Sequence, residues 1–275
     1  MDAARSASRF AQNAAQCISR PRDVPVPMRS CLVPLLSALL LAPLLATAQP
    51  ASAPAADASA PGPLPRPVQK LYVDVPPYYL SGDRFNAPAT VHVDPDWDKL
   101  LSSAKRADIR QAEQGIGAKP ELVKPQTFIV LAMRLYDVGL RDDAVFWYYV
   151  GRSRFVTMEA VLDMRSLQLA QSAQTVQRFV RAAEPAMDGY ALCSVARQQE
   201  IRDRAIAWVA DHPYQVLGYA ELPAASDDRN AALVAAVEHL REEAKQDKAL
   251  MSDPAAVAAL DAHRALTHDH ERFCW

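Results

Sequence analysis

The stretch DDAVFWYYVG (residues 142–151) decides how this sequence folds, because it places four aromatic side chains in a row. Successive residues of an α-helix turn by about 100°, so the four rings would spread around most of a helix and cannot form one flat platform. A helix that is apolar on most of its sides is normally buried at the centre of a fold. The sequence therefore predicts that the run fills a core, and its members are Phe146, Trp147, Tyr148 and Tyr149.

A second interpretation assigns the same helix to binding. Trp147 or Tyr149, together with Arg152 or Arg154 one or two turns further on, would then face a groove and hold a peptide or a glycan. These four side chains are the candidate binding residues of the chain.

The sequence on both sides of this stretch predicts a mainly α fold, a single domain of many helices. Glycine is scarce, and apolar residues recur at spacings of three and four. Strand-like alternation is confined to residues 69–80 and 89–94, which predict a short N-terminal β-hairpin or two extended arms. The predicted helices cover residues 98–114, 126–138, 143–155, 157–170, 175–184, 195–211, 228–246 and 254–268.

The helix before the aromatic run has a matching apolar stripe, and a short connection through Gly139 predicts an antiparallel hairpin of the two. The pattern resembles the helix-turn-helix of tetratricopeptide and related short helical repeats. The resemblance implies that small residues let the two helices approach closely, and more remotely it implies protein or peptide binding. The closing proline is absent, and the pattern does not recur at the family's period. The residues that carry the resemblance are Phe128, Leu131, Ala132, Leu135, Gly139, Ala144, Tyr148 and Gly151.

The N-terminal part predicts export. Residues 28–48, MRSCLVPLLSALLLAPLLATA, have a cationic start, an apolar run and a small-x-small ending, which is typical of a cleaved secretory signal. The apolar run is shorter than the roughly 20 residues that span a membrane. We therefore expect cleavage after Ala48, no membrane span afterwards and a periplasmic or secreted product.

Three further segments complete the expected organisation. Residues 1–27 are polar and precede Met28, so they predict a non-native extension, and the true start is either Met1 or Met28. Residues 49–67 are rich in Ala, Pro and Ser and predict a disordered tether. Residues 68–275 predict the helical domain.

The chain has 4 cysteines, and Cys17 and Cys31 precede the predicted cleavage point. The mature chain keeps Cys193 and Cys274, and an even pair in an oxidising compartment predicts a disulfide. The alternative is two unconnected thiols.

Possible metal ligands crowd the C-terminus. His263, His268, His270 and Cys274 all have competent donor atoms. Their spacing fits no established zinc pattern, and a disulfide would occupy the thiol. The sequence therefore predicts no metal and no other cofactor, and it leaves the three histidines as weak candidates.

Charge and motifs narrow the function. A net charge of −2 without a basic stripe does not suggest nucleic acid as a partner. The predicted mature chain has no G-x-S-x-G elbow, no H-E-x-x-H motif and no glycine-rich phosphate loop, which disfavours an enzyme. We expect an exported helical protein that binds a protein partner in the bacterial envelope, as an adaptor or an immunity-like protein. The alternative is a periplasmic enzyme, such as a hydrolase acting on cell-wall material, with its site in a helical groove.

Overall fold

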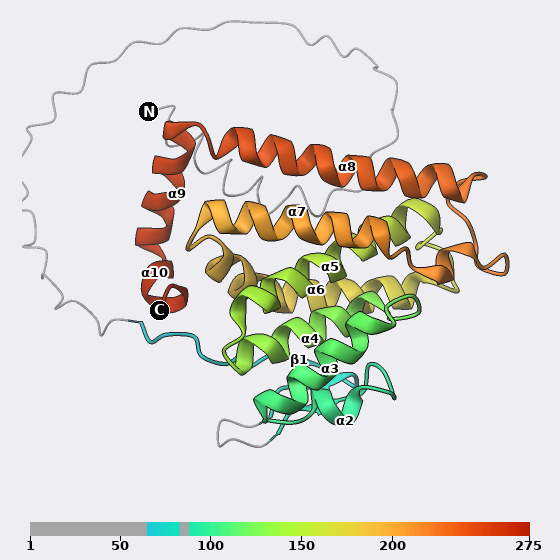
Figure 1. The fold of residues 1–275 in the computed structure, drawn as a ribbon, viewed down its shortest axis with the longest axis horizontal. Coiled ribbons are helices and arrows are strands. Elements are labelled where there is room, and N and C mark those ends of the chain that lie inside the picture. The colour runs from blue at the N-terminus through green and yellow to red at the C-terminus, as the bar shows by residue number, and fades with distance from the viewer. Residues whose placement is uncertain (1–64, 83–87) are drawn as a thin grey trace, which may run out of the picture. The chain divides into compact units, whose positions relative to one another are not determined.

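A computed structural model of the chain describes residues 65–82 and 88–275, and residues 65–275 form one compact unit. This unit is mainly helical, as the sequence predicts (Figure 1). Its α-helices are α2 (Asp98–Leu101), α3 (Arg106–Ala118), α4 (Pro125–Asp137), α5 (Arg141–Val161), α6 (Ala170–Ala191), α7 (Val195–Asp211), α8 (Arg229–Leu250), α9 (Pro254–Leu266) and α10 (Asp269–Phe273), and a 3-10 helix, η1, covers Gln215–Gly218.

Helices α4 and α5 form the predicted hairpin. Gly139 makes the turn between them with a φ of 78°, a left-handed conformation that favours glycine. Gly151 allows the two helices to approach, because a Cβ atom there would lie 2.8 Å from Cγ1 of Ile129 and 3.0 Å from the carbonyl oxygen of Pro125. A larger residue at this position would push α4 and α5 apart. The relation of the hairpin to tetratricopeptide repeats stays a prediction.

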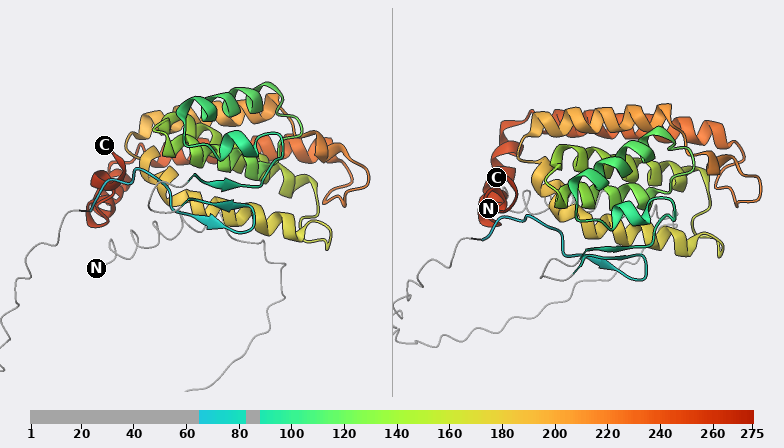
Figure 2. Two further views of the ribbon diagram at one scale, coloured as in Figure 1. Left: turned by 90° about the horizontal axis from the view of Figure 1, so that it is seen from below. Right: turned by 60° about the horizontal axis from the view of Figure 1, so that its bottom comes forward.

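Helix α5 is the central element of the fold. It packs against α4, α6, α7 and α8, and it is buried on most of its sides. Figure 2 shows the α4–α5 hairpin with the α7–α8 layer along one side and with α6 and the small sheet along another. Trp147 stacks on Phe128 with 5.4 Å between ring centroids, and it meets Trp208 of α7 edge to face at 5.3 Å. Trp147, Tyr148 and Tyr149 are buried and Phe146 is half-buried.

A small antiparallel sheet and one extended arm precede the helices. The pairing of β2 with β3 matches the predicted hairpin, whereas the third strand, β1, was not predicted and the two extended arms of the alternative do not occur. The strands are β1 (Asp74–Val75), β2 (Tyr79–Leu80) and β3 (Thr90–Val91), paired in that order. In the arm, the Val68 N–H donates to the Arg272 carbonyl at 2.7 Å, and the Tyr136 hydroxyl donates to the Val68 carbonyl at 3.0 Å. The arm therefore ties the first described residues to α4 and α10.

Two of the predicted helix assignments are wrong. The helix expected over 98–114 is two helices, because the Ser103 hydroxyl accepts the Lys105 N–H and competes with the helical ladder. The helices expected over 143–155 and 157–170 are not separate. Helix α5 runs on to Val161, and the chain then leaves it at Leu162, which is extended and pairs with Ala224.

The predicted end of a helix before Pro185 is also wrong. Helix α6 continues through this proline to Ala191. A proline inside a helix removes one hydrogen bond and costs about 3 kcal/mol. Burial of Ala186 and Met187 beside the exposed proline offsets this cost.

The predicted extension, the signal peptide and residues 49–64 of the predicted tether lie outside the described residues. Within the described ranges, no helix is both long enough and apolar enough to cross a membrane.

Candidate functional site

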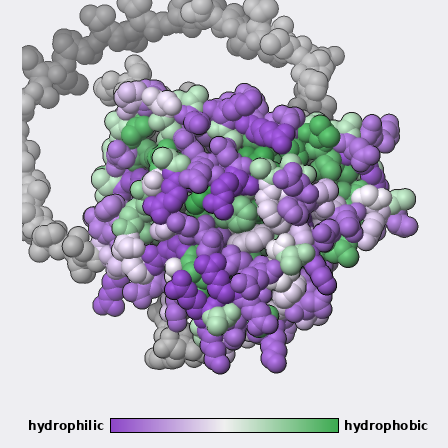
Figure 3. Space-filling view, viewed as in Figure 1, coloured by the Kyte–Doolittle hydropathy of each residue, from purple (hydrophilic) through white to green (hydrophobic). Residues whose placement is uncertain are grey.

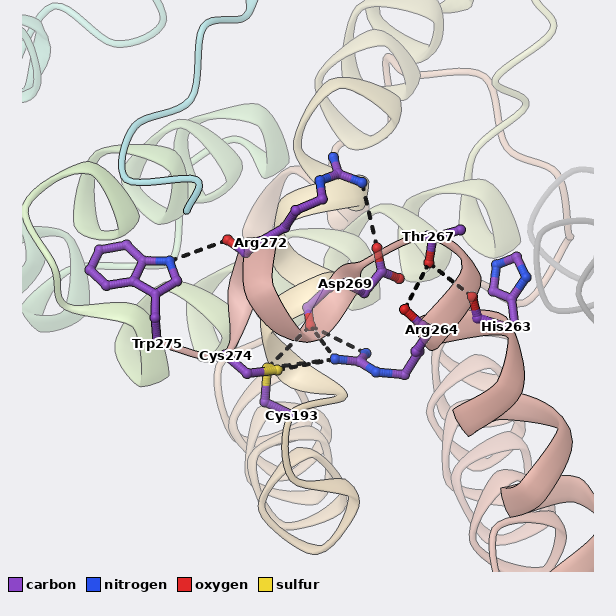
Figure 4. Close-up of polar contacts among 9 residues, drawn as sticks. Cys193, His263, Arg264, Thr267, Asp269, Arg272, Cys274 and Trp275 are labelled. Carbon is purple, nitrogen blue, oxygen red and sulfur yellow. Dashed lines mark hydrogen bonds and ion pairs between the residues drawn. A yellow bond between two sulfur atoms is a disulfide. The ribbon is translucent and has the colours of Figure 1, made fainter. Parts of the chain in front are cut away.

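A disulfide joins the C-terminal segment to the connection between α6 and α7 (Figure 4). It links Cys193 to Cys274, whose Cα atoms are 5.5 Å apart, so the predicted pair is present. The Arg264 guanidinium lies beside it and donates to Sγ of Cys274 at 3.1 Å and to the Gly189 carbonyl at 3.4 Å. Residue 189 has to be small, because a Cβ atom there would lie 2.5 Å from the Phe273 ring. The last two helices are thus stapled to α6.

The histidines of this segment do not form a metal site in the described part of the chain. No group of three or more His, Cys, Asp or Glu side chains among the described residues is placed to hold a metal ion. His263, His268 and His270 are exposed, and the thiol of Cys274 is used in the disulfide. His268 has a φ of 54° and redirects the chain from α9 into α10.

Helix α9 is the least buried of the longer helices. Its sequence is mostly alanine, valine and leucine, yet Arg264 is its one buried residue. Leu266 at its end is 82% exposed. Figure 3 shows apolar side chains mixed with hydrophilic ones at this end of the molecule. Val257 and Leu260 are half-buried, so the exposed apolar part of the helix consists mainly of alanines and Leu266. An exposed apolar strip on a helix is typical of an interaction site.

The four candidate binding residues lie in two different environments. Two of them, Trp147 and Arg154, lie in the core. The Trp147 indole N–H donates to the Glu113 carboxylate at 2.9 Å. The Arg154 side chain is fully buried, and burial lowers its pKa to about 10. Neither residue lines a groove. The Arg154 guanidinium instead holds two loops against α5, since it donates to the carbonyls of Pro120, Val123 and His212 at 2.6, 3.0 and 2.7 Å.

The other two, Tyr149 and Arg152, belong to a cluster of polar side chains from three helices. On each helix two of its members lie four residues apart, a spacing that directs both to one side. We call this set the polar cluster, and it consists of Tyr148, Tyr149 and Arg152 of α5, Glu184 and Asp188 of α6, and Gln198 and Arg202 of α7.

Burial makes the electrostatics of the polar cluster unusual. The Gln198 amide donates to the Tyr149 hydroxyl at 3.0 Å, and the Arg152 guanidinium lies 5.5 Å from the centroid of the Tyr148 ring. Burial raises the pKa of Asp188 to about 6, although the charge of Arg152 opposes this shift. Burial also raises the pKa of the Tyr148 hydroxyl well above its usual value. The cluster therefore contains a carboxyl group that exchanges its proton near neutral pH.

Sequence reasoning found Tyr149 and Arg152 and missed the acidic half of the cluster. Glu184 and Asp188 show the four-residue spacing in the sequence, and so do Gln198 and Arg202. This four-residue spacing is the sequence pattern that could have identified the missed residues.

A second polar site lies under the N-terminal arm. A cavity of about 170 Å³ opens between the arm and α4 and is lined by Lys70, Arg134 and Asp137 among others. The Asp137 carboxylate accepts the Leu71 N–H at 2.7 Å and pairs with Arg134. Arg134 also donates to the carbonyls of Leu101 and Ser103, both at 2.9 Å. Burial raises the pKa of Asp137 to about 6. This ion pair holds the arm and the α2–α3 connection on α4.

One serine–lysine motif lies outside the expectations above. Ser102-x-x-Lys105 matches the S-x-x-K spacing of penicillin-binding enzymes. The Ser102 hydroxyl donates to the Asp98 carbonyl at 2.7 Å and accepts the Val91 N–H at 3.1 Å, while Lys105 is exposed at the start of α3. The two side chains flank a helix break, and the hydroxyl has a structural role.

Acidification is expected to stabilise the fold. Asp137 and Asp188 have pKa values of about 6 in the folded chain, against an ordinary value of 3.8. The folded state therefore binds protons more tightly than the unfolded state, and the free energy of unfolding rises as the pH falls from about 7 to about 4.

The substitution Asp188→Asn should raise the free energy of unfolding at about pH 7.5 by roughly 1 kcal/mol and weaken this pH dependence, because it removes a buried charge. Thermal melts at about pH 7.5 and about pH 5 measure both effects. Asp203→Asn, at an exposed position of α7, is the matched control. The same pH dependence in Asp188→Asn and in the unmodified chain would show that the raised pKa of Asp188 does not contribute to it.

Comparison with known proteins yields a relative but no matching family model and no matching solved structure. An uncharacterised protein of Haemophilus influenzae is 31% identical to this chain over 209 residues, which are 76% of this chain and 80% of that protein.

Proposed function

The chain belongs to the same family as the uncharacterised Haemophilus influenzae protein, and we propose that it is an exported helical protein that binds a protein partner in the bacterial envelope. The observation that carries this proposal is the exposed apolar face of α9, which consists of Ala255, Ala258, Ala262, Ala265 and Leu266. The signal-like residues 28–48 and the disulfide support export, because disulfides persist in oxidising compartments.

The links between the C-terminal segment and α6 fix the position of α9 before a partner binds. The disulfide and the contact of Arg264 with Gly189 hold α9 and α10 at the end of α6. A surface that is already fixed loses less entropy when a partner docks. The α9 face is therefore a preformed docking surface.

The charged residues around this face indicate the charge that the partner's surface should carry. Asp253, Asp261 and Glu271 are exposed, and the two arginines of the segment are already engaged, since Arg264 is buried and Arg272 pairs with Asp269. A second copy of the chain would bring these acidic residues against each other. A partner with an apolar stripe and a basic rim is complementary in both respects.

The enzymatic alternative has weaker support. It would use the polar cluster, where the carboxyl group of Asp188 is suited to proton transfer near neutral pH. The neighbouring Tyr148 hydroxyl is a poor nucleophile at that pH, because burial raises its pKa well above 10. The enzymatic alternative therefore has less support than the binding role.

Substitution of Leu266 by arginine is expected to abolish partner recovery. The change places a cation on the docking face, opposite the basic rim of the partner, and leaves folding intact because the side chain is 82% exposed. Tagged protein is crosslinked in the envelope of the producing cell and purified, and the recovered proteins are quantified by mass spectrometry.

The matched control is Leu167→Arg, which alters an exposed leucine in the connection between α5 and α6. The partner is the protein recovered in stoichiometric amount with the unmodified chain and with Leu167→Arg. Equal recovery with Leu266→Arg would remove α9 from the binding surface.

A further inference from the structure

The polar cluster holds two carboxylates that lack a hydrogen-bond donor in the described structure. Glu184 and Asp188 lie one turn apart on α6, and the charge of Arg152 acts on both, but neither side chain accepts a hydrogen bond or forms a close ion pair with a described residue. Arg202, the cation that α7 contributes, is bound to Asp247 of α8. Like charges at this spacing destabilise a helix. The two carboxylates together favour a cationic group between them.

Two donors of the same cluster come from α5 and also lack partners. Within the described chain, Arg152 makes no hydrogen bond and no ion pair, and its guanidinium rests against the Tyr148 ring. The Tyr148 hydroxyl is fully buried and has no hydrogen-bond partner among the described residues. The charges of Arg152, Asp188 and Glu184 all act on this hydroxyl, which places it inside the cluster.

Charged groups of both signs whose hydrogen-bonding capacity is unused restrict the chemistry of a ligand. A simple cation would be attracted by the carboxylates of Glu184 and Asp188 but repelled by the charge of Arg152. A simple anion would be attracted by Arg152 but repelled by the two carboxylates. A small molecule that carries both charges satisfies both halves. The four charged residues of the cluster are partly exposed, so solvent reaches its rim.

We propose that the polar cluster binds a small zwitterion, with an ammonium group beside a carboxylate as in a free α-amino acid. The ammonium group binds between Glu184 and Asp188. The ligand carboxylate accepts from the Arg152 guanidinium and from the Tyr148 hydroxyl, which gives both donors the partner they lack. The site does not include α9, so it is independent of partner docking.

Isothermal titration of the purified full chain with glycine and with L-alanine tests this proposal. Both probes should bind saturably. N-acetyl-L-alanine lacks the ammonium group and L-alanine amide lacks the carboxylate, so each should bind at least about tenfold more weakly than L-alanine. The absence of saturable binding by both amino acids would overturn the proposal, and so would equal affinity for N-acetyl-L-alanine and L-alanine.

Two variants test the assigned roles. Asp188→Asn should weaken L-alanine binding about tenfold, and so should Tyr148→Phe. Tyr148→Phe removes a hydroxyl that has no partner in the described chain, so its melting temperature should be unchanged or raised. Asp203→Asn, exposed on α7, should leave affinity unchanged. If Tyr148→Phe and Asp188→Asn both bind L-alanine as the unmodified chain does, the cluster is structural and the proposal fails.

Discussion

Replacing Arg154 with methionine should lower the free energy of unfolding by about 2 kcal/mol. The guanidinium donates to three backbone carbonyls, and the Pro120 carbonyl also accepts the Val123 N–H, so two carbonyls lose their donor at a cost of roughly 1 kcal/mol each. Two of the three carbonyls belong to the loop between α3 and α4, and the third, that of His212, follows α7. Methionine keeps the apolar stem and fills most of the volume, so the loss reports the hydrogen bonds.

Urea unfolding followed by circular dichroism measures this loss. Arg154→Lys should fall between methionine and the unmodified chain, because one ammonium group lacks the planar fork that reaches carbonyls in two loops. Arg181→Met, at an exposed position of α6, is the matched control and should change stability by less than about 0.5 kcal/mol. If Arg154→Met is as stable as Arg181→Met, Arg154 does not clamp the loops.

Removal of the disulfide should cost about 4 kcal/mol. Cys193 and Cys274 are 81 residues apart in the sequence, and a crosslink that closes a loop of this length restricts the unfolded chain strongly. The double variant Cys193→Ala/Cys274→Ala should therefore melt well below the oxidised protein and match the reduced protein.

The loss should also be visible locally. Amide hydrogen exchange in α9, in α10 and at Val68 should accelerate in the double variant, because Val68 is bonded to the Arg272 carbonyl just before the staple. The central helix α5 should keep its slow exchange under native conditions. Equal melting temperatures for the double variant and the oxidised protein would show that the disulfide adds no stability.

The parts of the fold that follow from local pattern could be predicted from the sequence. The apolar stripes on both sides of Gly139 predict the hairpin, and the helix expected over 195–211 has the bounds found for α7. The pairing of Cys193 with Cys274 follows from counting the cysteines that remain after the predicted signal. Each of these inferences needs only neighbouring residues or a count.

The parts that depend on which helix faces meet could not be predicted. Arg152 and Arg154 are two residues apart, yet one joins the polar cluster and the other is buried against the rings of Phe128 and Trp208. Glu184 and Asp188 look like a solvated pair until α6 is packed against α5. Tertiary packing also carries α6 through Pro185, where local preference predicts an end.

The most direct measurement of α9 as a docking face is site-specific photo-crosslinking in the envelope of the producing cell. A photo-reactive residue at position 266 should give one major crosslinked protein, joined through a segment that combines an apolar stripe with Lys or Arg residues. The same residue at position 167 should give none, and Asp261→Lys should weaken the crosslink at 266, because it replaces an acidic residue beside the face with a cation. No crosslink at position 266, or the same products from both positions, would contradict a binding role for this helix.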